Sequence, residues 1–133
     1  MSVFVADTHP LLWFTLNQQR NLSKAALKAF ENALTGIAYV HIPALVLYEV
    51  AMLENQGKVT LDNGFRLWTI NLLAHDGFGI APLEPEVIST AAGLAFNSDP
   101  FDKAIAATAV ELSLPLITRD SAITESGLVE ILW

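Results

Sequence analysis

The sequence predicts an α/β fold, a three-layer α/β/α sandwich built around a central, mostly parallel, twisted sheet. Short apolar segments that suit buried strands alternate with longer segments that suit helices along nearly the whole chain. This alternation is the pattern of parallel sheets whose two faces are covered by helices. The length of 133 residues, without repeats or a linker, predicts one domain over residues 1–133.

The first half of the chain supplies two predicted strands and four predicted helices. The run Val3-Phe4-Val5-Ala6 is apolar, ends at Asp7, and indicates a buried strand. Ser23 suits the N-cap of a helix, and Pro43 suits the first position of another. In chain order we expect a strand over 3–6, helices over 9–16 and 23–34, a strand over 37–41, and helices over 43–54 and 62–74.

The second half continues the alternation. Gly79 to Leu83 contains a weak strand, and Asp99-Pro100 has the composition of a helix start. Here we expect a strand over 79–83, helices over 84–96 and 100–113, and strands over 115–118 and 129–132.

Composition narrows the classes of function. The formal net charge is −7, from seven Lys and Arg against fourteen Asp and Glu, which argues against broad electrostatic binding of nucleic acid. A nucleic-acid enzyme stays possible, because clustered carboxylates can bind a divalent metal that meets the phosphate. The chain has no cysteine, so disulfides, thiolate zinc sites and cysteine nucleophiles are excluded.

The chain is apolar for its size, with 53% hydrophobic residues, which indicates a dense core or a surface covered by a partner. No apolar run approaches the roughly 20 residues of a membrane span. The first residues have no charged start and reach Asp7 after a short apolar stretch, unlike a signal peptide. We therefore expect no membrane contact and a cytoplasmic location.

Two acids follow predicted strands. Asp7 ends the first strand, and Asp120 follows the strand within residues 115–118. Ligands of parallel α/β sheets bind beyond the carboxyl ends of the strands. Both carboxylates are therefore expected at the functional edge of the sheet.

Two further acids lie where a helix should be apolar. Glu49 is four residues after Leu45 and four before Leu53, and Asp102 is three residues before Ile105. These spacings place both acids on or beside an inward face. An inward carboxylate is costly unless it is paired or bound to metal, and all-oxygen ligands suit Mg²⁺ or Mn²⁺ rather than zinc.

Each acid also has a purely structural interpretation. Asp7 can cap the helix that follows it, Asp120 can be a turn residue, and Glu49 can form a salt bridge. Asp99 has the features of an N-cap, which would leave Asp102 as a favourable first-turn acid.

Among other polar candidates, His9, His41 and His75 lack metal-ligand spacing. For Trp13, Trp68 and Trp133, packing is favoured over stacking on bases. Arg119 can either contact a phosphate or balance the nearby acidic charge, and the sequence favours neither role.

Four ordered stretches carry a resemblance to a known family. The chain resembles the PIN-domain family and, within it, the VapC-type toxins of bacterial toxin–antitoxin pairs. No single motif would suffice, but the order and spacing match across nearly the whole chain. The stretches are Val5-Ala6-Asp7-Thr8-His9-Pro10-Leu11-Leu12-Trp13, Leu47-Tyr48-Glu49-Val50-Ala51, Ser98-Asp99-Pro100-Phe101-Asp102-Lys103-Ala104-Ile105-Ala106-Ala107-Thr108-Ala109 and Leu116-Ile117-Thr118-Arg119-Asp120.

The resemblance implies a set of roles. It implies a Mg²⁺- or Mn²⁺-dependent endoribonuclease that hydrolyses phosphodiester bonds in single-stranded RNA, with an antitoxin as partner and a homodimer as assembly. The four acids of the family's site correspond to Asp7, Glu49, Asp102 and Asp120, which are expected to bind the metal and to act in catalysis. Asp99 corresponds to an additional acid, and Thr118 to a hydroxyl near the metal site. The chain departs from the usual pattern at Lys103, where Arg is frequent, and at Tyr48, where Trp is frequent.

Three rival functions remain open at this point. One is a PIN nuclease that is not a toxin, and another is a PIN fold kept as a catalytically silent binding module. The third is a receiver-like phosphoacceptor domain, which also uses a parallel sheet and Mg²⁺. A receiver normally has an acidic pair and a late Lys, whereas this chain has a single Asp after its first strand and no Lys beyond Lys103.

Overall fold

The computed structural model describes residues 1–133 and contains one five-stranded sheet, in which every neighbouring pair of strands is parallel. The predicted α/β class is confirmed, and the sheet is wholly rather than mostly parallel. The strand order is β3-β2-β1-β4-β5. The strands are β1 (Ser2–Ala6), β2 (Ala38–Pro43), β3 (Phe78–Ala81), β4 (Leu116–Ile117) and β5 (Ile131–Leu132).

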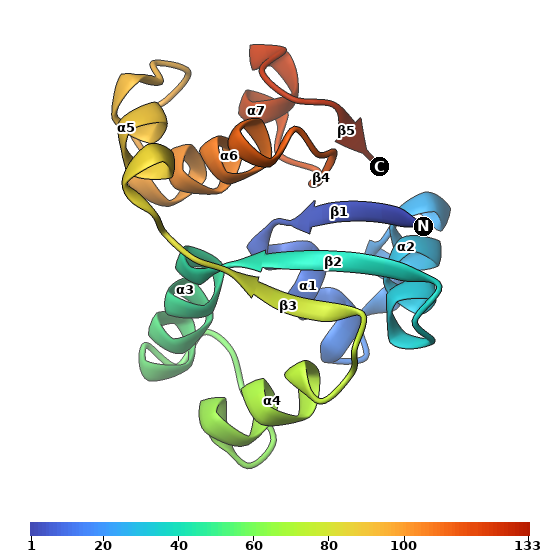
Figure 1. The fold of residues 1–133 in the computed structure, drawn as a ribbon. Helices are drawn as coiled ribbons and strands as arrows, with labels where there is room; N and C mark the ends of the chain where they lie inside the picture. The colour runs from blue at the N-terminus through green and yellow to red at the C-terminus, as the bar shows by residue number, and fades with distance from the viewer.

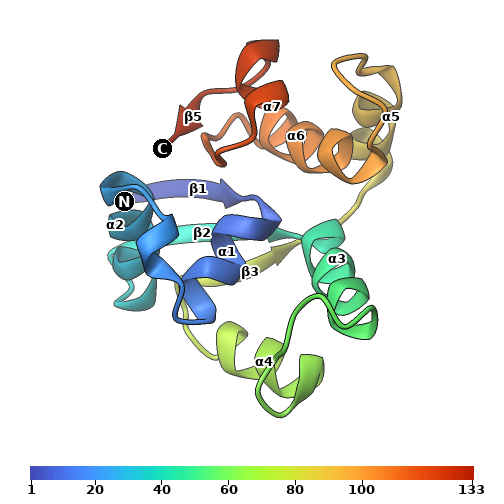
Figure 2. The same ribbon diagram turned by 180° about the vertical axis from the view of Figure 1, so that it is seen from behind.

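Helices flank this sheet. Figure 1 shows α5, α6 and α7 on the side of β4 and β5, and α4 beyond the opposite edge near β3, while Figure 2 shows α1 in front of the strands. The helices are α1 (Thr8–Thr15), the 3₁₀ helix η1 (Gln19–Asn21), α2 (Lys24–Leu34), α3 (Ala44–Asn55), α4 (Gly64–Leu73), α5 (Pro85–Gly93), α6 (Pro100–Leu112) and α7 (Ser121–Ser126). None of these helices has both the length and the apolar composition that crossing a bilayer requires.

The core surrounds the central strand β1. Val5 and Ala6 are fully buried, as are Val40 in the neighbouring strand β2 and Leu116 in β4. Packing across the sheet is aromatic on one side, where the Phe14 and Phe30 rings stack with centroids 5.0 Å apart. The core around β1 accounts for part of the apolar composition, while other large hydrophobic side chains, such as Ile37 and Ile70, are exposed.

The order of the strands creates a crevice between β1 and β4. From β1 the chain moves outward through β2 to β3, then crosses back and continues outward on the other side through β4 to β5. The connections on the two sides of this point run in opposite directions, so the helices diverge there. Such a topological switch point is where open α/β sheets bind their ligands.

Most predicted elements are present, with local differences. Pro43 was expected at the first position of a helix, but it is the last residue of β2 and pairs with Ala81 of β3. The helix predicted over 84–96 ends at Gly93, because Leu94 is extended. The short helices η1 and α7 were not predicted. Helix α7 has only six residues, too few for a helical period to be visible in the sequence.

Candidate active site

A cleft of about 470 Å³ opens at the switch point. Its lining includes carboxylates from both sides of the crevice and from two helices. Asp7 follows β1, Glu49 belongs to α3, Asp99 and Asp102 begin α6, and Asp120 follows β4. The structure thus brings all the predicted acids to one cleft, although they are separated by up to more than a hundred residues in the sequence.

The pairing of β1 with β4 positions Asp7. Ala6 pairs with Ile117, and the backbone N–H of Asp7 donates to the Ile117 carbonyl at 3.0 Å. This register places Asp7 beside Thr118, whose Oγ1 donates to Asp7 Oδ2 at 2.6 Å. The Thr8 N–H donates to Asp7 Oδ1 at 2.7 Å. Thr118 lines none of the cleft itself and acts from beneath it, being fully buried.

Burial dominates the electrostatics of Asp7. Removal from solvent raises the pKa of its carboxyl, and the negative charge of Glu49 raises it further. The hydrogen bonds from Thr118 and Thr8 lower this pKa, but not enough to cancel burial. A cation at the cleft would favour the charged form of Asp7 that burial disfavours.

Asp120 is linked to Asp7 through the same threonine. The Asp120 N–H donates to Thr118 Oγ1 at 3.0 Å, so this hydroxyl connects the two strand-end acids. One carboxylate oxygen of Asp120, Oδ1, accepts from the Ile123 N–H at 2.8 Å and caps α7. The turn interpretation of Asp120 is therefore correct as local structure, and the residue also lines the cleft.

Glu49 enters the cleft from the middle of α3. Its side chain is half-buried, and its Oε1 accepts from Thr8 Oγ1 at 2.5 Å. Thr8 therefore contacts two of the acids, through its backbone N–H to Asp7 and through its hydroxyl to Glu49. The inward position predicted from helical spacing is confirmed, and the partner of Glu49 is a hydroxyl rather than a basic side chain.

Asp102 has the strongest sign of mutual repulsion. The pKa of its carboxyl is raised to about 6, first by burial and then by the charges of Asp99, Asp120 and Asp7, in that order of effect. A single hydrogen bond from Asn97 Nδ2 to Asp102 Oδ2, at 3.1 Å, opposes the rise. Asp102 therefore senses three other acids of the cleft, as a converging carboxylate cluster requires.

Asp99 caps α6, as its position before Pro100 predicts. Its Oδ1 accepts from the Phe101 N–H at 2.8 Å, and its side chain is exposed at the rim of the cleft. Sequence reasoning missed Asn97, which bonds Asp102 and also accepts from the Asp99 N–H at 3.0 Å. The turn composition of Asn97-Ser98-Asp99 was the available signal.

The acids face one cleft without enclosing a metal-sized position, because no three acidic or histidine side chains approach closely enough to ligate one ion. The chemistry of the donors nevertheless fits a hard divalent cation. All the donors are carboxylate oxygens, and the raised pKa values of Asp7 and Asp102 reflect burial and repulsion that a cation would offset.

Aromatic and basic side chains form the rim. His9, Trp13 and Arg119 all line the cleft. The Arg119 guanidinium lies over the Trp13 ring at 4.6 Å from its centroid, an arrangement that a cation–π attraction stabilises. By contrast Trp68 is buried and donates to Thr15, and neither His41 nor His75 lines the cleft. Packing is thus the role of Trp68, as expected.

Fold and cleft together define an acid-lined α/β domain with a site at its topological switch point. Comparison with known proteins identifies the family: the model of the PIN domain matches residues 4–126. The chain belongs to the PIN domain family. It is also 32% identical over 122 residues to Ribonuclease VapC22 of Mycobacterium tuberculosis, covering 90% of this chain and 88% of that protein.

Solved structures share the fold at low identity. The VapBC2 complex of Rickettsia felis, bound to a DNA fragment from its promoter, contains a chain that matches with a TM-score of 0.68 and 13% identity, covering 97% of this chain and 96% of that one. Mycobacterium tuberculosis VapC20, a toxin that cleaves the sarcin-ricin loop, matches with a TM-score of 0.61 and 15% identity, covering 99% and 100%. The resemblance inferred from sequence motifs is confirmed.

Proposed function

We propose that this chain is a Mg²⁺- or Mn²⁺-dependent endoribonuclease that hydrolyses phosphodiester bonds in single-stranded RNA. One observation carries the proposal: Asp7, Glu49, Asp99, Asp102 and Asp120 line a single cleft at the switch point of the sheet. We further propose that residues 1–133 form one PIN domain and that the chain is the toxin of a toxin–antitoxin pair.

The cleft would hold the metal through its acidic quartet. Asp7, Asp102 and Asp120 would supply ligand oxygens, directly or through water, and Glu49 would complete the shell or orient the attacking water. A bound divalent cation lowers the pKa of its water and offsets charge on the reacting phosphate. The fit rests on the all-oxygen donor set and on the burial and repulsion recorded in the raised pKa values of Asp7 and Asp102.

The protein's own residues fix the positions of these acids. Thr118 holds Asp7 and the backbone of Asp120 through one hydroxyl, and Thr8 holds Glu49. Glu49 Oε2 takes part in none of the protein's hydrogen bonds, so this oxygen is free to accept a proton from water. Pre-set geometry of this kind lowers the reorganisation needed when charge develops on the phosphate.

The relatives support the substrate and the partner. VapC22 is a ribonuclease, and VapC20 cleaves the sarcin-ricin loop. Structural neighbours come from complexes of Rickettsia felis and Salmonella typhimurium VapBC with DNA, and from a toxin–antitoxin complex of Klebsiella pneumoniae. We propose RNA as substrate, a cognate antitoxin protein as partner, and a homodimer as the assembly of this chain.

Metal-dependent cleavage is the direct test. Purified protein is expected to cut single-stranded RNA in Mg²⁺ or Mn²⁺, to stop in EDTA, and to resume when metal is restored. The Asp102→Asn variant, purified identically, controls for contaminating nuclease. Equal cleavage in EDTA would contradict the metal requirement. Persistent inactivity on varied RNAs with both metals would favour a silent binding module.

The toxin assignment has a separate test. Co-expression with a short neighbouring reading frame is expected to yield a complex that survives purification, with RNA cleavage suppressed in it. An antitoxin Arg or Lys can pair with the carboxylates of the cleft. Separate elution of the two proteins at micromolar concentration, with cleavage retained, would favour a PIN nuclease that is not a toxin.

A further inference from the structure

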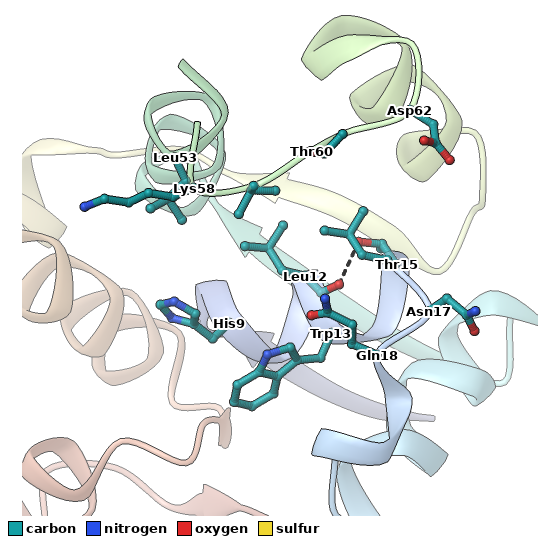
Figure 3. Close-up of a pocket in the computed structure, with 12 residues that line it drawn as sticks. His9, Leu12, Trp13, Thr15, Asn17, Gln18, Leu53, Lys58, Thr60 and Asp62 are labelled. Carbon is teal, nitrogen blue, oxygen red and sulfur yellow. Dashed lines mark hydrogen bonds between the residues drawn. The ribbon is translucent and has the colours of Figure 1, made fainter. Parts of the chain in front are cut away.

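A second cavity adjoins the acidic cleft. It has a volume of about 680 Å³, within the range of about 300–1,000 Å³ common for ligand sites. The cavity lies between α1, the end of α3 and the segment that leads to α4, as Figure 3 shows. His9 and Trp13 line both this cavity and the acidic cleft, so the two adjoin at these side chains.

We infer that this cavity receives a nucleotide next to the scissile phosphate of single-stranded RNA, and that Lys58 contacts a backbone phosphate there. The inference rests on the proposed function, because the acidic cleft defines where the scissile phosphate lies.

The charges of the cavity are arranged along its length. Figure 3 shows Lys58 and His9 at one end and Asp62 at the other. His9 also lines the acidic cleft, so the basic end is the end nearer the acids. A phosphate is attracted to Lys58 and repelled by Asp62. Only one orientation of a nucleotide therefore suits the cavity, with its phosphate toward the acidic cleft and its base toward Asp62.

The remaining walls suit a base. Asn17 and Gln18 carry amide groups that donate and accept, and neither side chain forms a hydrogen bond within the protein. Exposed base edges of single-stranded RNA are recognised by such groups. Trp13 forms a rigid wall, since its ring contacts Arg119 on one side and Trp133 in an edge-on arrangement with centroids 6.2 Å apart.

Lys58 is held in place by the end of α3. Gly57 adopts a left-handed backbone with φ of 74°. Its N–H donates to the Glu54 carbonyl at 3.0 Å, and the Lys58 N–H donates to the Leu53 carbonyl at 2.9 Å. This pair of bonds is the Schellman motif that terminates helices. The position of Lys58 at the cavity is therefore built into the fold rather than left to a mobile loop.

The overall charge makes this lysine consequential. With a net charge of −7, the protein repels RNA at long range, and the acids of the cleft repel it locally. Arg119 is the one Lys or Arg that lines the acidic cleft, and Lys58 is the one that lines the adjoining cavity. Together they provide positive charge at both places where the proposed RNA path runs.

Binding in EDTA tests the inference without the metal-loaded reaction. A short fluorescein-labelled single-stranded RNA is titrated at several salt concentrations with wild type, Lys58→Gln, Lys58→Arg and the control Lys28→Gln, an exposed lysine of α2 outside both cavities. We expect Lys58→Gln to bind about three- to tenfold more weakly, with a salt slope shallower by about 0.7, the value for one phosphate of a single strand. Lys58→Arg and Lys28→Gln should match wild type.

Kinetic measurements test the same role of Lys58 through the KM for RNA. In Mg²⁺, Lys58→Gln is expected to raise KM for RNA and to leave kcat unchanged, because Lys58 holds a flanking phosphate and not the reacting one. If Lys58→Gln binds and cuts like Lys28→Gln while wild type is active, the inference is overturned and the proposed function stands. If wild type neither binds nor cuts RNA, the proposed function fails, and this inference fails with it. If Lys58→Gln weakens only the complex with an antitoxin, the cavity docks protein and the inference is overturned.

Discussion

The acids that follow strands and the acids on helices reach the same cleft by different means. Asp7 and Asp120 are held by hydrogen bonds near the strand ends: Thr8 and Thr118 donate to the two carboxylate oxygens of Asp7, and the α7 backbone donates to Oδ1 of Asp120. Glu49 and Asp102 each accept one side-chain hydrogen bond only, from Thr8 and Asn97 respectively. Both strand acids therefore accept a hydrogen bond from a backbone N–H, whereas Glu49 and Asp102 each depend on a single side-chain donor.

The cleft therefore combines acids that are held rigidly by capping hydrogen bonds with an acid, Asp102, that is repelled by its neighbours. Capping bonds stabilise the charge of Asp7 and Asp120 by the same contacts that build α1 and α7. Asp102 has only the hydrogen bond from Asn97, and its raised pKa records the burial and repulsion that remain, as the raised pKa of Asp7 records its burial. Changes to helix acids should therefore affect mainly metal and activity, whereas changes beneath the strand acids should affect stability as well.

The largest expected effect comes from Asp102→Asn. The change keeps the shape, removes a charge and relieves repulsion, so stability in metal-free buffer should be unchanged or raised. RNA cleavage should fall by at least about 100-fold, since charge at the metal is what the chemistry uses. The increase in Tm that Mg²⁺ gives by binding the folded state should also shrink.

The matched control for this change is Asp76→Asn, at an exposed acid outside the cleft. It should leave cleavage and the Mg²⁺-dependent Tm unaltered. An Asp102→Asn protein that melts much lower without metal yet still cuts RNA would make Asp102 a structural first-turn acid, and the contrast between helix and strand acids would break there.

Thr118→Val should show the opposite balance. The substitution keeps volume but leaves the buried Asp7 carboxylate and the Asp120 N–H without their shared partner, at a cost of about 1–3 kcal/mol. Activity should fall about 10- to 100-fold, the range for lost support of metal ligands. Denaturant unfolding and an RNA cleavage assay measure the two effects.

Thr108→Val is the control for Thr118, because Thr108 is also buried but its hydroxyl bonds the Ala104 carbonyl of its own helix. It should keep activity close to wild type. Loss of activity in both variants alike would indicate a general response of the core, and would remove the special role of Thr118 beneath the strand acids.

Asp99→Ala should cost stability and spare part of the activity. The Asp99 carboxylate caps α6 through the Phe101 N–H, and loss of an N-cap costs about 0.5–2 kcal/mol. Asp99→Asn, which retains a capping oxygen, should recover most of that stability. If Asp99→Ala abolishes cleavage while its Tm is unchanged, Asp99 belongs with the acids that serve the reaction rather than with the caps.

The smallest expected effect is a pH dependence of stability due to Asp102. Its pKa is raised from 3.8 to about 6 in the folded protein, so the unfolded chain loses this proton first as pH rises. Below about pH 4 both states hold the proton, and the difference in stability is absent. Between pH 4 and 6 the contribution becomes destabilising, and it is fully present above pH 6.

Asp102→Asn removes this contribution. In metal-free buffer the variant and wild type should melt together near pH 4, and the variant should melt a few degrees higher at pH 7. A thermal-melt series across this pH range measures the difference. A gap of constant size at all pH values would contradict the assignment of the repulsion to this carboxyl.

The periodicity of apolar residues in the sequence was enough to predict the fold class and the inward positions of two of the acids. The alternating pattern predicted the parallel sheet, and the spacing of Glu49 and Asp102 placed them inward on their helices. The order of four short motifs identified the family, which the match over residues 4–126 confirms. Such features are local, because helix faces and strand ends follow from residues a few positions apart.

Tertiary structure alone decided what depends on strands far apart in the chain. That β1 pairs with β4 creates the crevice and brings Thr118 to Asp7, although the two residues are separated by 111 positions. Helix α7 is too short to form a pattern and exists because Asp120 caps it and Ile123 is buried. The cavity beside the cleft, with Lys58 held by the end of α3, also depends on how α1 and α3 pack. Periodicity specifies which face of an element is apolar, but the choice of neighbours follows from the burial of all faces together.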